Sequence, residues 1–471
     1  MSGVTAASTE FNPAIEFWGG PLGLPEFGRI GVADLEAAFD VALPAHLAEI
    51  EAIAADPAAP NFENTIVALE RAGDLLSKTS DIFWNLASAH SDDALQALER
   101  ALSPRMSRHR SAITMNGALF ARIDALYRQI DGLGLDAEAA RVLELTWKSF
   151  VRAGAQLDAG GQTRLAAINE RLAALGTAFS QNVLADEAEY ALFLERDEDL
   201  AGLPETLVAS MAAAAEARGR PGAYAVTLSR SIIEPFLTFS ERRDLRRTAF
   251  EAWAARGETA PERDNRPLVA EMVRLRAEKA DLLGYRSFAH FKLDDTMAKT
   301  PEAVRTLLET MWEKALGRAA EEAAELAELV AAAGHNHEVA PWDWRHYAEK
   351  ARSARYDFDE AALRPYLQLD KMIAAAFHVA ETLFGVTFEE HADVPTYHPD
   401  VRVFEARDAA GARLAVFLGD YFARPSKRSG AWMSAFRSQH RLAGDGARQV
   451  PVILNVMNFA KPAPGAPTLI T

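Results

Sequence analysis

The sequence predicts a mainly α-helical protein with a small antiparallel β element near its C-terminal end. Apolar residues recur at helical spacing over most of the chain before residue 397, whereas alternating apolar runs gather after it. Three of these runs, VRVFEA, RLAVFLGDYFA and QVPVILNVMNF, predict strands. We therefore expect an N-terminal helical region over 1–190, a helical body with a small β element over 191–396, and a β-rich segment over 397–471.

The N-terminal region begins with an irregular arm that contains several glycines and prolines. Its apolar residues Leu24, Phe27 and Ile30 are expected to pack along the helical body. From Val32 the apolar residues follow helical spacing, and the run DPAAPN ends the first helix. The next helix starts at Asn61 or Asn64. Further helices are expected over 92–130, 135–155 and 161–186, with Gly132, Gly134, Gly160 and Gly161 between them.

The central region predicts a two-stranded element and further helices. The runs EYALFL and AYAVTL flank a helix over 204–218. Ser240 is expected to cap a helix that ends near Arg256. Thr300 followed by Pro301 is a strong start signal for a long helix that Gly334 closes. Two more helices are predicted over 267–283 and 369–384.

Composition excludes several classes of function. The net charge of -17 disfavours a nucleic-acid or anionic-membrane partner, because binding a polyanion needs a basic surface. The chain has no cysteine, which excludes disulfides, thiolate metal sites and a cysteine nucleophile. The N-terminus lacks the pattern of a signal peptide, and the longest apolar run, MIAAAFHVA, is far too short to span a membrane. We expect a soluble, cytoplasmic protein.

Histidines are concentrated in the last third of the chain, but none of the eleven has another histidine four residues away. Two zinc-ligating histidines on one helix need that spacing to project toward the same ion. The pair His335 and His337 follows the helix stop at Gly334 and is expected to be solvated. His398 precedes Pro399, and we interpret it as structural. Nucleophile elbows and phosphate-binding loops are also absent, so the residues alone indicate no catalytic constellation.

The predicted strand RLAVFLGDYFA has one feature that points toward binding. A glycine inside a strand, here Gly419, often marks the close approach of another backbone. If this strand lay at an edge of the sheet, an extended peptide would pair with its main chain. The alternative is a core strand with a bulge at Gly419.

Nine stretches in order resemble the thimet oligopeptidase family of zinc metallopeptidases, in its peptidyl-dipeptidase branch. They are LPEFGRI, PNFENTIVALERAGDLL, AFSQNVL, LVAEMVRLRAEKADLLGY, DDTMAKTPEAV, PWDWRHYAEK, YHPDVRVFEA, FLGDYFARPSKRSGAW and PVILNVMNFAKPAPGAPTLIT. The resemblance implies a helical body of two lobes around a deep channel that admits short unfolded peptides. It also implies that the protein is a monomer. It also implies zinc held by an H-E-x-x-H helix, whose glutamate serves as general base.

That zinc-binding helix begins, in the family, after the position matching Thr471. The resemblance therefore carries over no catalytic or metal residue, and we expect this chain to bind no zinc and to be inactive alone. In the family the segment matching Phe417, Leu418, Gly419 and Asp420 contacts the substrate backbone, so these four residues are the predicted substrate-binding site. The alternative is a non-catalytic, helical peptide-binding or scaffold protein.

Overall fold

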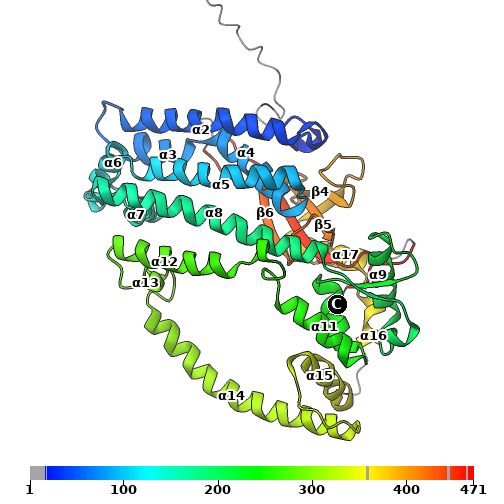
Figure 1. The fold of residues 1–471 in the computed structure, drawn as a ribbon. Helices are drawn as coiled ribbons and strands as arrows, with labels where there is room; N and C mark the ends of the chain where they lie inside the picture. The colour runs from blue at the N-terminus through cyan, green and yellow to red at the C-terminus, as the bar shows by residue number, and fades with distance from the viewer. Residues whose placement is uncertain (1–15, 17, 357–359, 443–445, 463–464, 471) are drawn as a thin grey trace, which may run out of the picture. The chain divides into compact units, whose positions relative to one another are not determined.

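The computed structural model describes residues 16, 18–356, 360–442, 446–462 and 465–470 (Figure 1). Its described residues form two compact units, and the mainly α-helical prediction is confirmed. The first unit comprises Met1–Thr177, Phe384–Asp420 and Trp432–Val456. The second comprises Ala178–Leu383, Tyr421–Ala431 and Met457–Thr471.

The helices of the first unit begin at polar caps. Asn61 and Asn64 cap each other's backbone at the start of a short π-helix, and the Asp92 side chain accepts a hydrogen bond from the Leu95 N–H. The helix expected over 92–130 is interrupted at Met115, because Asn116 caps a new helix. The helices are α2 (Val32–Ala54), α3 (Ala68–Arg71), α4 (Asp74–Ala89), α5 (Asp93–Thr114), α6 (Gly117–Tyr127), α7 (Ala137–Arg152) and most of α8 (Ala159–Glu189).

The main sheet has five strands in the order β3-β4-β5-β7-β6. The three predicted strands are β4, β5 and β7, and the sequence reading missed the two edge strands β3 and β6. In the β4–β5 pair Val403 lies opposite Leu418, and Gly419 lies opposite Arg402 without a register shift, so this pair has no bulge at Gly419, the feature that the core-strand alternative included. The bounds are β3 (Thr387–Glu390), β4 (Val401–Arg407), β5 (Arg413–Phe422), β6 (Trp432–Arg437) and β7 (Val452–Phe459).

One face of this sheet forms the core of the first unit together with the N-terminal helices. Phe39 of α2 and Phe83 of α4 belong to the same buried cluster as Val416 and Leu418 of β5. The described part of the N-terminal arm joins this core as expected, since the rings of Phe27 and Phe436 meet edge to face at 5.2 Å. Burial of the arm therefore depends on a strand more than 400 residues away in the sequence.

The second unit contains the predicted two-stranded element, in which β1 (Leu192–Leu194) and β2 (Tyr224–Val226) pair antiparallel. Thr300 caps the long helix as predicted, and Gly334 follows its end with a positive φ of 77°. Ser240 does not start a helix; it ends one that the sequence reading missed. The helices are α9 (Glu205–Glu216), α10 (Arg230–Phe239), α11 (Arg243–Ala254), α12 (Arg266–Leu282), α13 (Phe288–Leu293), α14 (Pro301–Ala332), α15 (Pro341–Tyr356), α16 (Glu360–Leu363) and α17 (Leu369–Phe384).

Helix α14 is long and gently curved (Figure 1). Its first half presents large apolar side chains to solvent. Leu307, Leu308, Met311, Trp312 and Leu316 are each more than half exposed. A contiguous apolar stripe of this kind is uncommon on a soluble protein surface. Across the described part of the chain, none of the helices combines the length and hydropathy that crossing a membrane requires.

A pair of histidines, with His109 buried and His46 half-buried, joins α2 to α5. His109 Nε2 lies 3.0 Å from His46 Nδ1, and the two rings share one hydrogen bond. Burial, reinforced by the nearby His46, lowers the pKa of His109 to about 4. Burial also lowers the pKa of His46, against the charge of Glu49. The folded first unit therefore favours neutral imidazoles at this position.

We expect this pair to make the first unit acid-sensitive. Because the pKa of His109 is depressed in the folded state, its contribution to stability is present above pH 6.5 and is lost as the pH falls toward about 4. Relative to His109→Gln, the wild type should lose about 2–4 kcal/mol of unfolding free energy between pH 7 and pH 4. Urea denaturation across that range measures the difference. Parallel curves for the two proteins would contradict the prediction.

Candidate functional site

The predicted peptide-binding segment lies inside the sheet. Strand β5 has β4 on one side and β7 on the other, so the edge-strand alternative is wrong and the core-strand alternative is confirmed. Strand β4 pairs with the segment from Phe417 to Asp420. On the β7 side, the flanking Val416 N–H donates to the Pro451 carbonyl and the Ala423 N–H donates to the Phe459 carbonyl. A peptide cannot pair with the main chain of this strand in the described structure. The alternation pattern did not reveal this, because inner and edge strands share it.

The four predicted residues do not converge on one open surface. Leu418 and Asp420 are fully buried, and Asp420 accepts a hydrogen bond of 2.7 Å from the Tyr397 hydroxyl. Phe417 points to the opposite face, where its ring lies 5.9 Å from that of Phe404. Gly419 is buried between them. A role for Phe417, Leu418, Gly419 and Asp420 in binding peptides stays a prediction.

The histidines considered as metal ligands are spread over separate places. His335 and His337 stack on each other at 5.6 Å, and His337 Nδ1 lies 3.0 Å from its neighbour's carbonyl oxygen. His398 Nδ1 accepts a hydrogen bond from the Asp400 N–H, and its ring packs against His90. His346 is buried, and burial together with Arg246 and Lys350 lowers its pKa to about 4.

Pairing of β3 with β4 creates the one metal-compatible group found among the described residues. Ligand atoms of Glu389, His391 and Glu405 lie within 4.8 Å of one another. The sequence reading missed this group because Glu389 and Glu405 meet only through the strand register. Glu405, however, is ion-paired with both Arg407 and Arg413. Burial alone would raise the pKa of Glu405, but these two arginines lower it below its usual value.

A catalytic zinc site needs three protein ligands, commonly two imidazoles and a carboxylate. The group at Glu389 offers one imidazole, and its buried carboxylate is already neutralised by two guanidinium groups. Histidines at helical i, i+4 spacing do not occur in the sequence. The residues that the structure describes therefore do not fit a catalytic zinc ion.

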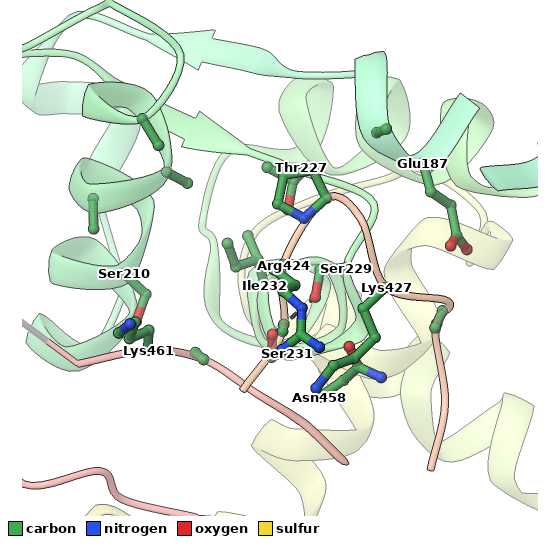
Figure 2. Close-up of a pocket in the computed structure, with 18 of the residues that line it drawn as sticks. Glu187, Ser210, Thr227, Ser229, Ser231, Ile232, Arg424, Lys427, Asn458 and Lys461 are labelled. Atoms are coloured by element: carbon green, nitrogen blue, oxygen red, sulfur yellow. Dashed lines mark hydrogen bonds between the residues drawn. The ribbon is translucent and has the colours of Figure 1, made fainter. Parts of the chain in front are cut away.

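The second unit contains a cavity of about 300 Å³ whose wall is unusually basic (Figure 2). We call it the cationic cavity. Its charged side chains are four cations, Arg218, Arg424, Lys427 and Lys461, and one carboxylate, Glu187. Glu187 is itself ion-paired with Arg256. The hydroxyl-bearing residues of the wall are Ser210, Thr227, Ser229, Ser231 and Ser429.

Five separate segments build this wall. Arg218 follows α9, and its guanidinium donates to the carbonyl oxygens of Ala214 and Ala188, at the C-terminal ends of α9 and α8. Lys427 donates to the carbonyls of Phe422 and Met457, which holds the loop after β5 against the end of β7. The sequence reading missed the cavity because these segments are remote along the chain. The only local signal was the basic run RPSKR after β5.

A second cavity, of about 550 Å³, adjoins the first, because Ser210, Ser231 and Ala460 line both. Its charges are more balanced, since Glu234 and Arg345 in its wall form an ion pair of 3.3 Å. Together the two cavities give the second unit a hollow with one basic end. Cavities of this size accommodate small ligands or short peptide segments.

Comparison with known proteins gives this geometry a context. The family model described as Peptidase family M3 matches residues 236–471. The chain belongs to this peptidase family. The resemblance to zinc metallopeptidases found in the sequence is thereby confirmed, since M3 is a metallopeptidase family.

Two groups of M3 relatives are similar over nearly the whole chain. The chain is 37% identical to dipeptidyl carboxypeptidase of Escherichia coli, over 98% of its own length and 67% of that protein. It is 30% identical to oligopeptidase A of Salmonella typhimurium, over 95% of its length and 66% of that protein. The higher identity lies with the dipeptidyl carboxypeptidase, as the sequence motifs indicated.

Proposed function

We propose that this chain forms the helical, peptide-binding part of a zinc-dependent peptidase that hydrolyses short peptides and releases C-terminal dipeptides. The observation that carries this proposal is the 37% identity to a dipeptidyl carboxypeptidase across 98% of the chain. The adjoining cavities of the second unit support it, because together they offer a hollow suited to a short peptide rather than to a folded protein.

The 471 residues are proposed to be inactive alone. The described histidines and carboxylates do not fit a catalytic zinc ion, and a metallopeptidase without its metal lacks the group that activates water. Within this proposal, Phe417 and Asp420 belong to the supporting sheet: Asp420 holds Tyr397, and Phe417 packs on Phe404. Phe417 and Asp420 would then affect substrate binding indirectly, by positioning the surface that contacts the peptide.

The proposal is tested by measuring zinc content and hydrolysis of a short blocked peptide. Both are measured on the 471-residue chain and on a longer chain extended by the residues encoded downstream. We expect one zinc per chain and hydrolysis only in the extended protein. Stoichiometric zinc or hydrolysis in the 471-residue chain would contradict the proposal. Peptide binding without zinc or hydrolysis in either protein would favour a non-catalytic peptide-binding protein instead.

A further inference from the structure

We infer that the exposed apolar face of α14 is the interface between two copies of this chain. The inference goes beyond the proposed peptidase function and does not depend on it. The occupant of the face is the α14 of a second copy, which lies antiparallel to the first with a two-fold axis at Met311. The side chains that form this α14 face are Val304, Leu307, Leu308, Met311, Trp312 and Leu316.

The first half of α14 has no cover in the described structure. Every residue from Arg305 to Glu321 is exposed. The helix is anchored only near its ends, where Glu302 forms an ion pair of 2.6 Å with Arg286 and Val330 packs in one cluster with Tyr347 of α15. Most of the stability of a helix in a protein comes from packing of its apolar face rather than from intrinsic propensity. The uncovered half therefore favours a partner.

The spacing of the α14 face is that of a helix that packs on another helix. Val304, Leu308 and Met311 follow one another at i, i+4 and i+7, and Leu307 and Trp312 widen the same side. Trp312 is 64% exposed. Tryptophan is among the residues that contribute most to binding energy at protein interfaces. The face thus offers both a continuous contact row and an aromatic anchor.

The area of the face is sufficient for a pair of identical copies. Five of its side chains are more than half exposed, namely Leu307, Leu308, Met311, Trp312 and Leu316. With about 100–150 Å² exposed on each, two copies would bury roughly 1,000–1,500 Å² in total, which reaches the size of the smaller specific interfaces. One copy alone therefore provides a surface large enough to form a dimer with itself.

The charges along α14 select an antiparallel arrangement. Between residues 302 and 318 three glutamates are balanced by two arginines and one lysine, so two first halves can meet without net repulsion although the chain carries -17. Between residues 319 and 332 the helix has four glutamates and no basic residue. In a parallel pair these acidic halves would lie side by side and repel each other. In an antiparallel pair they point to opposite ends, which is the two-fold arrangement of most homodimers.

Sedimentation velocity of the 471-residue chain over a range of concentrations tests the inference. We expect a monomer–dimer equilibrium with a dissociation constant of about 10 μM. Met311→Glu and Met311→Lys should each weaken the dimer at least about tenfold, because a residue on the two-fold axis meets its own copy and the like charges repel. An equimolar mixture of the two variants should restore the dimer. Met311 is 65% exposed, so circular dichroism should show unchanged helix content.

Leu383→Glu on α17 is the matched control. Leu383 is 66% exposed and belongs to the same unit, but it lies outside the α14 face. This variant should dimerise like the wild type. A monomer at every concentration would overturn the inference, and so would a dimer that Leu383→Glu dissociates and Met311→Glu does not. Failure of the mixed Met311 variants to dimerise would overturn the antiparallel arrangement.

The extended chain is measured in parallel, because residues downstream are the competing occupant of the α14 face. A dimer of the extended chain that Met311→Glu dissociates would support the inference for the longer protein. A monomeric extended chain would assign the face to the downstream residues and overturn the inference for the longer protein. Zinc content and hydrolysis decide the peptidase proposal separately, so failure of either proposal leaves the other standing.

Discussion

Replacing Asp343 by asparagine should destabilise the second unit by about 3–5 kcal/mol, because it removes the negative charge from a buried ionic cluster. Asp343 is fully buried at the start of α15 and accepts hydrogen bonds from Arg243 and Arg246 of α11. Arg246 is only 2% exposed and also donates to the carbonyls of Ser240 and Trp342. Without the carboxylate, the Arg246 cation would remain buried with only neutral acceptors.

Urea denaturation measures the loss for Asp343→Asn, and hydrogen exchange of α11 and α15 locates it. Glu251→Gln is the matched control on α11, since Glu251 is exposed and pairs with Arg247 across one helical turn. Exposed pairs of this kind contribute at most about 1 kcal/mol, so the control should stay close to wild type. Equal stability of the two variants would show that the buried carboxylate does not hold α11 to α15.

Replacing Phe436 by alanine should cost the first unit about 3–5 kcal/mol, because it empties a fully buried site between the sheet and the N-terminal arm. The Phe436 ring meets Phe27 edge to face at 5.2 Å and lies 6.1 Å from the Tyr397 ring. We also expect the arm around Phe27 to lose protection against hydrogen exchange, since it packs on this strand. The cavity would not collapse easily, because its walls come from separate elements.

Met433→Ala provides the control for Phe436→Ala within the same strand. Met433 is 68% exposed, so its truncation removes little buried area and should change stability by no more than about 0.5 kcal/mol. Chemical denaturation and exchange of the segment around Phe27 measure both variants. A loss for Phe436→Ala as small as for Met433→Ala would mean that the arm and the sheet are stabilised independently.

In the main sheet, strand prediction succeeded for three strands of alternating apolar residues and failed for β3, which ion pairs stabilise, and for β6, although its run WMSAFR contains four apolar residues. The β4, β5 and β7 runs alternate apolar residues, and all three were predicted. The run TFEE of β3 has a single apolar side chain. It pairs with β4 through cross-strand contacts such as that between Glu390 and Arg402, at 2.7 Å. Apolar periodicity cannot reveal a strand that is held mainly by charges on another strand.

Helix boundaries were predicted well where local chemistry decides them. At the start of α14, Thr300 caps the helix through its side chain and Pro301 has a fixed φ. After its end, Gly334 has a left-handed conformation. Each of these signals acts on the adjacent turn of the helix only. Helix α10 was missed because Pro235 lies inside it, and a proline normally argues for a helix end. The buried side chains of Ile233 and Phe236 hold this helix against its neighbours in the second unit, which outweighs the local cost of the proline.

Sequence by itself determined the helical class of this protein and most helix ends, because both rest on local residue patterns. It also determined the membership in a metallopeptidase family, which rests on short stretches that occur in the family's order. Tertiary structure alone decided that β5 is an inner strand, that Glu389 and Glu405 meet, and that Arg218 and Arg424 face one cavity. These features depend on strand register and on loops brought together from distant segments. Such contacts are set by burial and charge across the whole unit, which no short window of sequence contains.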